Sequence, residues 1–249
     1  MTGEELAARV LYRDAMMLVI DKPAGIAVHR GPKGGENLEQ HFHALRFGLP
    51  RSPALVHRLD RGTSGCLVLG RHHKALEKLG LLFKQGRIEK TYWAVVEGNP
   101  VWDEGLIDLP LMRLDPSRGW WMKAGAQGLP AQTRWKVIAR SGERAFLELK
   151  PLTGRTHQLR VHCAASGWPI LGDAIYGHGR GELQLHARAI AIPLYKNKEA
   201  VRAEAPLPEH MRSLLAAGFQ GLSLDSAASG LRAGPDLPDM ASSLRTGRQ

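Results

Sequence analysis

Short apolar runs alternate with polar segments along the chain, and most of these runs have the length and composition of β-strands. Runs bounded by turn residues and rich in aliphatic, β-branched or aromatic side chains predict strands at residues 17–20, 26–29, 66–69, 92–97, 133–139 and 145–149. The Pro-Ala-Gly stretch at 23–25 and the Ser-Gly-Glu stretch at 141–143 are turn signals that separate neighbouring strands.

Other segments have the period of an amphipathic helix. The first predicted helix covers residues 72–85, carries its leucines on one stripe and ends before Gly86. A second begins at residues 153–155 and runs to Ser166, and Gly167 closes it. A third covers residues 207–217. Because strands and helices follow one another without a regular βαβ rhythm, the fold class expected is α+β.

The pattern predicts one domain over residues 1–224. From residue 225 the sequence is rich in Ser, Gly, Pro and Ala and has no periodicity. A composition of this kind does not bury enough apolar surface to order a chain, so residues 225–249 are expected to be a disordered tail.

The charge balance narrows the classes of partner. The chain has 34 Lys and Arg against 24 Asp and Glu, a net charge of +10. Residues 57–90 hold eight basic and three acidic side chains, half of that excess. A concentrated basic excess attracts polyanions and favours nucleic acid as the partner. The alternative is a solvated basic face that maintains solubility.

Two cysteines, Cys66 and Cys163, do not make a disulfide framework. Residues 1–20 contain acidic side chains and no long apolar run, so neither a signal peptide nor a transmembrane helix is expected there. The sequence is therefore interpreted as that of a soluble cytoplasmic protein.

The first segment with the composition of a reactive site is residues 57–65. Asp60 lies between Arg58 and Arg61, and a Gly-Thr-Ser turn follows before the predicted buried strand. Nearby guanidinium groups favour the ionised carboxylate, which is suited to act as a nucleophile or a base. The alternative is an aspartate that caps the turn and pairs with Arg58 or Arg61.

Other kinds of site are not indicated. The spacing at residues 62–65 differs from the Gly-x-Ser-x-Gly nucleophile elbow. His157 and His162 are five residues apart and would not share one helix face as a metal-binding pair does. The chain has no dinucleotide-binding or P-loop motif. No metal, nucleotide or flavin is implied.

His57-Arg58-Leu59-Asp60, with Thr63-Ser64-Gly65, closely resembles the signature of the RluA-type family of RNA pseudouridine synthases. The resemblance spans roughly residues 10–195 and continues in order through Asp21-Lys22-Pro23-Ala24-Gly25, Lys90-Thr91-Tyr92, Gly154 to His162, Gly167 to Asp173 with Tyr176, and Leu185-His186-Ala187.

This resemblance implies the catalytic residues. Asp60 matches the essential aspartate, which either attacks the sugar or acts on it as a base. Arg160 matches the arginine that pairs with this aspartate, and Tyr92 matches the active-site tyrosine, whose ring stacks on the base while its hydroxyl is available for proton transfer. The alternative for Tyr92 is a strand tyrosine in the core. His57 either contacts RNA or packs in the core, and the structural role is the one expected.

The same resemblance implies how RNA is held. Arg58 matches the arginine associated with base flipping; the alternative is a phosphate contact, which is equally open for Arg61. Lys90 either helps to orient the active site or binds phosphate. Arg155, at the expected helix start, would bind phosphate with the helix amides. Leu159 is expected to line the uracil pocket, although a helix-core leucine would look the same.

The family fold is a mixed, mainly antiparallel sheet with flanking helices and a central basic active-site cleft, here expected within residues 1–224. The implied activity is isomerisation of uridine to pseudouridine in structured ribosomal or transfer RNA. It needs no cofactor, and a monomer is expected. The alternatives are a catalytically silent RNA-binding protein or chaperone on the same fold, and a glycosidic hydrolase. The hydrolase is disfavoured because such enzymes usually pair two carboxylates.

Overall fold

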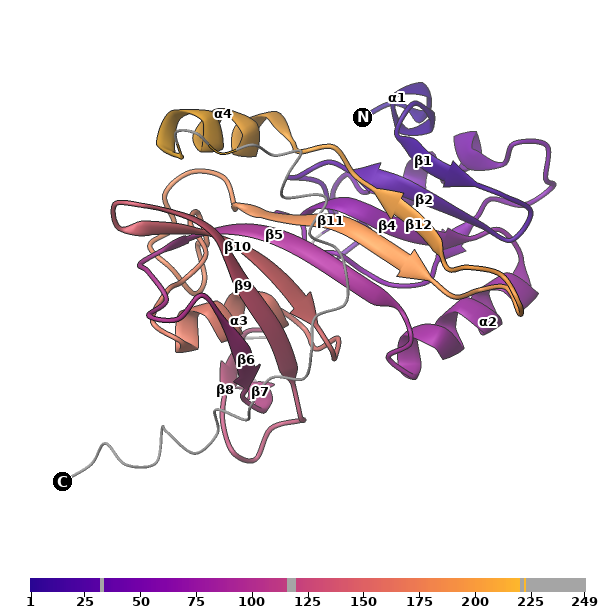
Figure 1. Ribbon diagram of the computed structural model, residues 1–249. Helices are drawn as coiled ribbons and strands as arrows, with labels where there is room; N and C mark the ends of the chain where they lie inside the picture. Colours follow the sequence, from indigo (N-terminus) through magenta and orange to yellow (C-terminus); the bar gives the residue numbers. More distant parts are fainter. Residues whose placement is uncertain (32–33, 116–119, 220–221, 223–249) are drawn as a thin grey trace. The chain divides into compact units, whose positions relative to one another are not determined.

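The computed structural model describes residues 1–31, 34–115, 120–219 and 222 (Figure 1). The tail predicted at 225–249 lies outside these residues. The chain divides into two compact units. Unit 1 comprises Met1–Tyr92 and Leu185–Pro208, and unit 2 comprises Trp93–Gln184 and the chain from Glu209 onward.

Unit 1 is built on a sheet in which β1, β2, β4 and β11 are successive neighbours, with β3 added to β4 and β12 to β11 (Figure 1). The pairs are antiparallel except β4 with β11, which is parallel. The elements of unit 1 are α1 (Gly3–Ala7), β1 (Val10–Arg13), β2 (Met17–Lys22), the 3₁₀ helix η1 (Leu38–Leu45), β3 (Ala54–Leu55), β4 (Ser64–Gly70), α2 (His73–Lys84), β11 (Leu185–Ile192) and β12 (Val201–Glu204).

Strand β4 is buried along its whole length, because both of its faces are covered. Cys66 and Val68 belong to a core cluster that includes residues of α2, whereas Leu67 and Leu69 belong to a cluster that includes residues of α1 and η1. This arrangement explains why the strand reads as a continuous apolar run rather than an alternating one.

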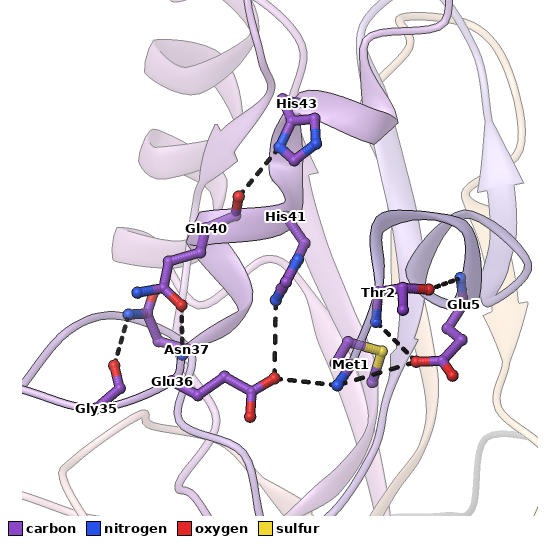
Figure 2. Close-up of polar contacts among 9 residues, drawn as sticks. All are labelled: Met1, Thr2, Glu5, Gly35, Glu36, Asn37, Gln40, His41 and His43. Carbon is purple, nitrogen blue, oxygen red and sulfur yellow. Dashed lines mark hydrogen bonds and ion pairs between the residues drawn. The ribbon is translucent and has the colours of Figure 1, made fainter.

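Polar contacts tie α1 to the segment that leads into η1 (Figure 2). Thr2 and Glu5 form a capping box at the start of α1. The Met1 ammonium donates to Glu36 Oε1 at 3.0 Å, and His41 Nε2 lies 3.7 Å from the same oxygen. Gly3 allows α1 and η1 to approach closely, since a Cβ there would lie 2.8 Å from a side-chain atom of η1.

Strand β5 (Glu89–Glu97) begins in unit 1 and continues into unit 2. In unit 2 it is followed across the sheet by β10, β9 and β6, and β7 and β8 form a separate hairpin (Figure 1). The other elements of unit 2 are β6 (Glu104–Asp108), β7 (Leu111–Arg113), β8 (Met122–Ala124), β9 (Gln132–Ser141), β10 (Arg144–Pro151), α3 (Gln158–Ala165) and α4 (Glu209–Gly218).

The predicted α+β class is confirmed, and the strand pairings among the described residues are mostly antiparallel. Strands appear where they were predicted at 17–20, 66–69, 92–97, 133–139 and 145–149. The helices predicted at 72–85 and 207–217 correspond to α2 and α4. Strands β1, β3, β6, β7, β8, β11 and β12 were not predicted.

Two predicted elements are wrong in type or extent. Residues 26–29 form a single bridge at Ala27, because the carbonyls of Ala27 and Val28 accept from Leu38 and Glu39 at the start of η1. The helix predicted to begin at 153–155 begins at Gln158. Its N-cap, His157, has a positive φ of 53°, which breaks the helical conformation there.

Candidate active site

Asp60 lies in a short loop between β3 and β4. The loop contains a turn in which the Thr63 backbone N–H donates to the Asp60 carbonyl oxygen at 3.1 Å. Leu59 is buried in the core, the Asp60 residue is partly buried, and Arg58 and Arg61 are exposed. The buried leucine therefore anchors the loop, and the acid is more sheltered than the two arginines on either side of it.

The fully buried Lys22 fastens this loop to the end of β2. Its Nζ donates to the carbonyl oxygens of Pro23 at 2.8 Å, Arg61 at 3.1 Å and Thr63 at 2.8 Å. Gly25 strengthens the same connection, because its N–H donates to the Arg61 carbonyl and its own carbonyl accepts from Arg61 Nε at 2.7 Å. The residues around Lys22 thus hold the backbone on the C-terminal side of Asp60.

Two groups in unit 1 respond to the charge of Asp60. Burial lowers the pKa of Lys22 to about 7, and the negative charges of Asp60 and Asp21 oppose this shift. Burial, with the Asp60 charge second, raises the pKa of the Tyr92 phenol well above its ordinary value. The Tyr92 phenol therefore stays protonated.

The start of β4 packs against β11 so closely that only glycine fits. Gly65 has a φ of +103°, and a Cβ there would lie 2.2 Å from the carbonyl oxygen of Ala187. In the adjacent pair, the Ser64 hydroxyl and His186 Nδ1 are 2.9 Å apart, and His186 Nε2 lies 3.2 Å from the Ala205 carbonyl. These contacts join two motifs that are more than 120 residues apart in the sequence.

His57 belongs to the loop between β3 and β4, and the charge of Lys90 acts on it. His57 Nε2 accepts the Val68 backbone N–H at 2.9 Å, and the ring stacks on Phe83. Burial, with the Lys90 charge second, lowers the pKa of His57 to about 3, so the ring is neutral. Burial also lowers the pKa of Lys90. These contacts give His57 the structural role that was expected.

The two flanking arginines differ in their surroundings. Arg61 already donates through Nε to the Gly25 carbonyl, so part of its guanidinium helps to hold the loop in place. The Arg58 side chain forms no hydrogen bond or ion pair with another residue in the described part of the chain. Its expected contact with RNA remains a prediction.

In unit 2, the first turn of α3 is held by Gln158. Its Oε1 accepts from the Thr153 hydroxyl at 2.7 Å and from the Arg155 backbone N–H at 3.0 Å. Its Nε2 donates to the Gln132 carbonyl at 2.9 Å and to Thr133 Oγ1 at 3.0 Å. The glutamine of the Gly154-to-His162 motif therefore fixes where α3 begins relative to β9.

The expectation for Arg155 needs correction. Arg155 precedes the N-cap His157 by two residues, so it does not stand at the helix start. Its Nε donates to the Pro130 carbonyl at 3.0 Å. The helix amides therefore do not support a phosphate site at Arg155, although its guanidinium is exposed.

Arg160 and Leu159 are both buried on α3. Arg160 forms a two-pronged ion pair with Asp173, with Nε to Oδ2 and Nη2 to Oδ1 both at 2.7 Å. Leu159 is 7% exposed, which fits both a pocket wall and a helix-core leucine.

The predicted site residues therefore occupy both units: Asp60, Tyr92, Arg58, Arg61 and Lys90 in unit 1, and Arg155, Leu159 and Arg160 in unit 2. The sequence alone predicted no role for Lys22, His186, Asp173 or Tyr176, although all four lie within motifs of the resemblance. The signal was available: each is a polar residue beside apolar positions, and such a residue needs partners when buried.

Over the described ranges, no group of three or more His, Cys, Asp or Glu side chains is arranged to hold a metal ion. Cys66 and Cys163 are both buried and both free. None of the helices in the described residues is long and apolar enough to cross a membrane.

Comparison with known proteins agrees with these motifs. The family model for RNA pseudouridylate synthase matches residues 16–165. An uncharacterized RNA pseudouridine synthase of Zymomonas mobilis is 45% identical over 215 residues, covering 84% of this chain and 98% of the relative. The dual-specificity RNA pseudouridine synthase RluA of Yersinia pestis is 39% identical over 189 residues, covering 74% of this chain and 91% of the relative.

Among solved structures, human RNA pseudouridylate synthase domain containing 1 matches with a TM-score of 0.73 and 32% identity. The match covers 96% of this chain and 99% of that one. Both the sequence relatives and the fold lead to one assignment: the chain belongs to the RluA-type family of RNA pseudouridine synthases, which are isomerases.

Proposed function

We propose that Asp60 is the essential catalytic residue with which this enzyme converts uridine to pseudouridine in structured RNA. The observation that supports the proposal most directly is the arrangement of residues around the Asp60 loop in unit 1. Hydrogen bonds from the buried Lys22 side chain hold the loop, and burial together with the Asp60 charge raises the pKa of the Tyr92 phenol, which keeps it protonated. A fixed carboxylate beside a proton-carrying group is suited to covalent or acid–base catalysis.

The proposed reaction breaks the bond between uracil N1 and the ribose C1′ and forms a bond between C5 and C1′ after the base turns. C5 loses a proton and N1 gains one, so there is no net oxidation or reduction and no cofactor is needed. Asp60 either attacks the sugar or removes a proton from it. Tyr92 stacks on the base and carries a proton.

The other predicted residues have proposed roles in binding. Arg160 pairs with Asp60, Leu159 lines the uracil pocket, and Arg58 fills the space that the flipped base leaves. In this proposal, RNA phosphates are contacted by the positive side chains of Arg61, Lys90 and Arg155. The proposed substrate is ribosomal or transfer RNA, and the Yersinia relative is itself named a dual-specificity RNA pseudouridine synthase.

Asp60→Asn tests the proposal. The substitution keeps the size of the side chain and removes its charge and nucleophilicity. We expect the single-turnover rate to fall by about three orders of magnitude or more, while folding and RNA affinity are largely retained. The rate is measured as tritium release from [5-³H]uridine-labelled RNA of a strain that lacks this gene, and affinity is measured by filter binding.

Asp103→Asn is the matched control, since Asp103 is an exposed carboxylate paired with Arg140 in unit 2. It should react at the wild-type rate. If Asp60→Asn kept full turnover, Asp60 would not be the catalytic residue. If the wild-type protein bound RNA but released no tritium from it, a silent RNA-binding protein would be the better description.

A further inference from the structure

A second carboxylate, that of Asp173, forms an ion pair with the arginine that the proposed mechanism uses. Arg160 is 7% exposed, so its charge is largely removed from water. The Asp173 carboxylate, whose side chain is fully buried, accepts from both Nε and Nη2 of Arg160 at 2.7 Å. A two-pronged pair of this kind fixes the plane of the guanidinium as well as its distance, which a single contact would not do.

Asp173 is itself held in one orientation by the backbone. Its Oδ1 also accepts the N–H groups of Ile175 at 2.9 Å and Tyr176 at 3.1 Å. Burial alone would raise the pKa of Asp173, but the Arg160 guanidinium and these two N–H groups lower it below its ordinary value. The carboxylate is therefore charged and rigidly placed before any substrate is bound.

Tyr176 fixes a further side of the guanidinium. The Arg160 Cζ lies 5.2 Å from the centre of the Tyr176 ring, within the range of a cation–π contact. The Tyr176 hydroxyl accepts the Met122 backbone N–H at 2.9 Å and lies 2.7 Å from His157 Nδ1. A tyrosine held at its hydroxyl keeps its ring at a constant position beside Arg160.

We propose that Asp173 and Tyr176 are positioning residues that set the orientation of Arg160 for catalysis. The proposal rests on the proposed function, in which Arg160 pairs with the Asp60 carboxylate. Asp173 occupies the edge of the guanidinium formed by Nε and Nη2 and thereby fixes the direction in which the rest of the guanidinium faces. Neither Asp173 nor Tyr176 touches the reacting atoms in this scheme; both act through Arg160.

Asp173→Asn is the principal test. The amide keeps an oxygen for the N–H groups of Ile175 and Tyr176 but can no longer accept from both nitrogens of Arg160. We expect the single-turnover rate of tritium release to fall by about 100-fold, since a misplacement of about 1 Å has effects of that size. The RNA dissociation constant should stay close to that of the wild-type protein. A residue needed only for the overall fold would not separate rate from affinity in this way.

The double variant Asp173→Asn with Arg160→Lys shows whether the effect passes through Arg160. Lysine keeps the charge but cannot form the two-pronged pair. In the Arg160→Lys background, Asp173→Asn should have little further effect on the rate. Effects that multiply in the double variant would overturn the proposal, because Asp173 would then act independently of Arg160.

Tyr176→Phe provides a test that does not depend on the stability of Asp173→Asn. It removes the hydroxyl contacts but leaves the ring, and it should lower the rate by about three- to tenfold with RNA affinity unchanged. Asp103→Asn again serves as the control that should react normally. Full activity of both Asp173→Asn and Tyr176→Phe, with Asp60→Asn inactive, would refute this inference and leave the proposed function standing. Full activity of Asp60→Asn would refute the proposed function itself.

Discussion

At the scale of single residues, the site depends on a few buried polar side chains with several partners each. Lys22 has three carbonyl acceptors, and Arg160 has both oxygens of Asp173. Burying a charge is unfavourable unless hydrogen bonds and opposite charges offset the lost hydration. The partners supply this offset, and in doing so they immobilise the backbone or side chain next to the proposed chemistry.

Lys22→Met tests this view of Lys22. Methionine fills similar volume but leaves the carbonyl oxygens of Pro23, Arg61 and Thr63 without the ammonium. We expect the free energy of unfolding to fall by about 1–3 kcal/mol and the rate of tritium release to fall as the Asp60 loop loosens. Urea denaturation and single-turnover assays measure the two effects.

Lys136→Met is the matched control, because Lys136 is exposed on β9. It should leave both quantities nearly unchanged. Equal stability of the Lys22 and Lys136 variants would show that the three contacts of Lys22 contribute nothing to folding.

At the scale of elements, strand pairing brings distant motifs together. β2 pairs with β4, so the end of β2 meets the loop that precedes β4. β4 pairs in parallel with β11, so Gly65 lies opposite Ala187. Apolar runs predict that a strand exists, but they do not say which strand lies beside it. The pairing of β4 with β11 therefore could not be predicted from the pattern, although the motifs at both strands were visible.

Gly65→Ala should be strongly destabilising. The new Cβ would lie 2.2 Å from the Ala187 carbonyl oxygen, and the backbone would keep a positive φ that alanine disfavours. We expect a loss of about 3 kcal/mol or more in the free energy of unfolding, measured by thermal or urea denaturation.

Gly142→Ala separates the cost of backbone strain at a positive φ from the cost of a steric clash of the new Cβ. Gly142 also has a positive φ, of +56°, but a Cβ there would meet nothing within 4 Å. Its substitution should cost about 1–2 kcal/mol from backbone strain alone. If the two variants were equally stable, the close approach of β4 and β11 would have no energetic consequence.

At the scale of the whole molecule, the positive charge is unevenly divided. Unit 1 has 19 Lys and Arg against 11 Asp and Glu, a net +8, whereas unit 2 has 15 against 13, a net +2. Unit 1 also carries Asp60. Most of the long-range attraction for a polyanion therefore originates from the unit that bears the proposed catalytic acid.

RNA binding should weaken steeply as salt concentration rises, because phosphate contacts release counterions. The logarithm of the association constant should fall linearly with the logarithm of salt concentration. Lys90→Gln, which removes a proposed phosphate contact, should reduce the slope by about one, whereas Lys136→Gln in unit 2 should not. A slope near zero for the wild-type protein would contradict an electrostatic mode of RNA binding.

Local pattern alone determined the α+β class, most of the long strands, helices α2 and α4, and the motifs that identify the family. These features depend on residues that are close in sequence, where hydrophobic period and turn chemistry act directly. Tertiary contacts decided the rest. The carbonyls of Ala27 and Val28 accept hydrogen bonds from the start of η1 instead of from a neighbouring strand. Helix α3 begins only at Gln158. The partners of Lys22, His186 and Arg160 were likewise set by the fold, because a buried polar group takes whichever partners the packing of distant segments brings to it.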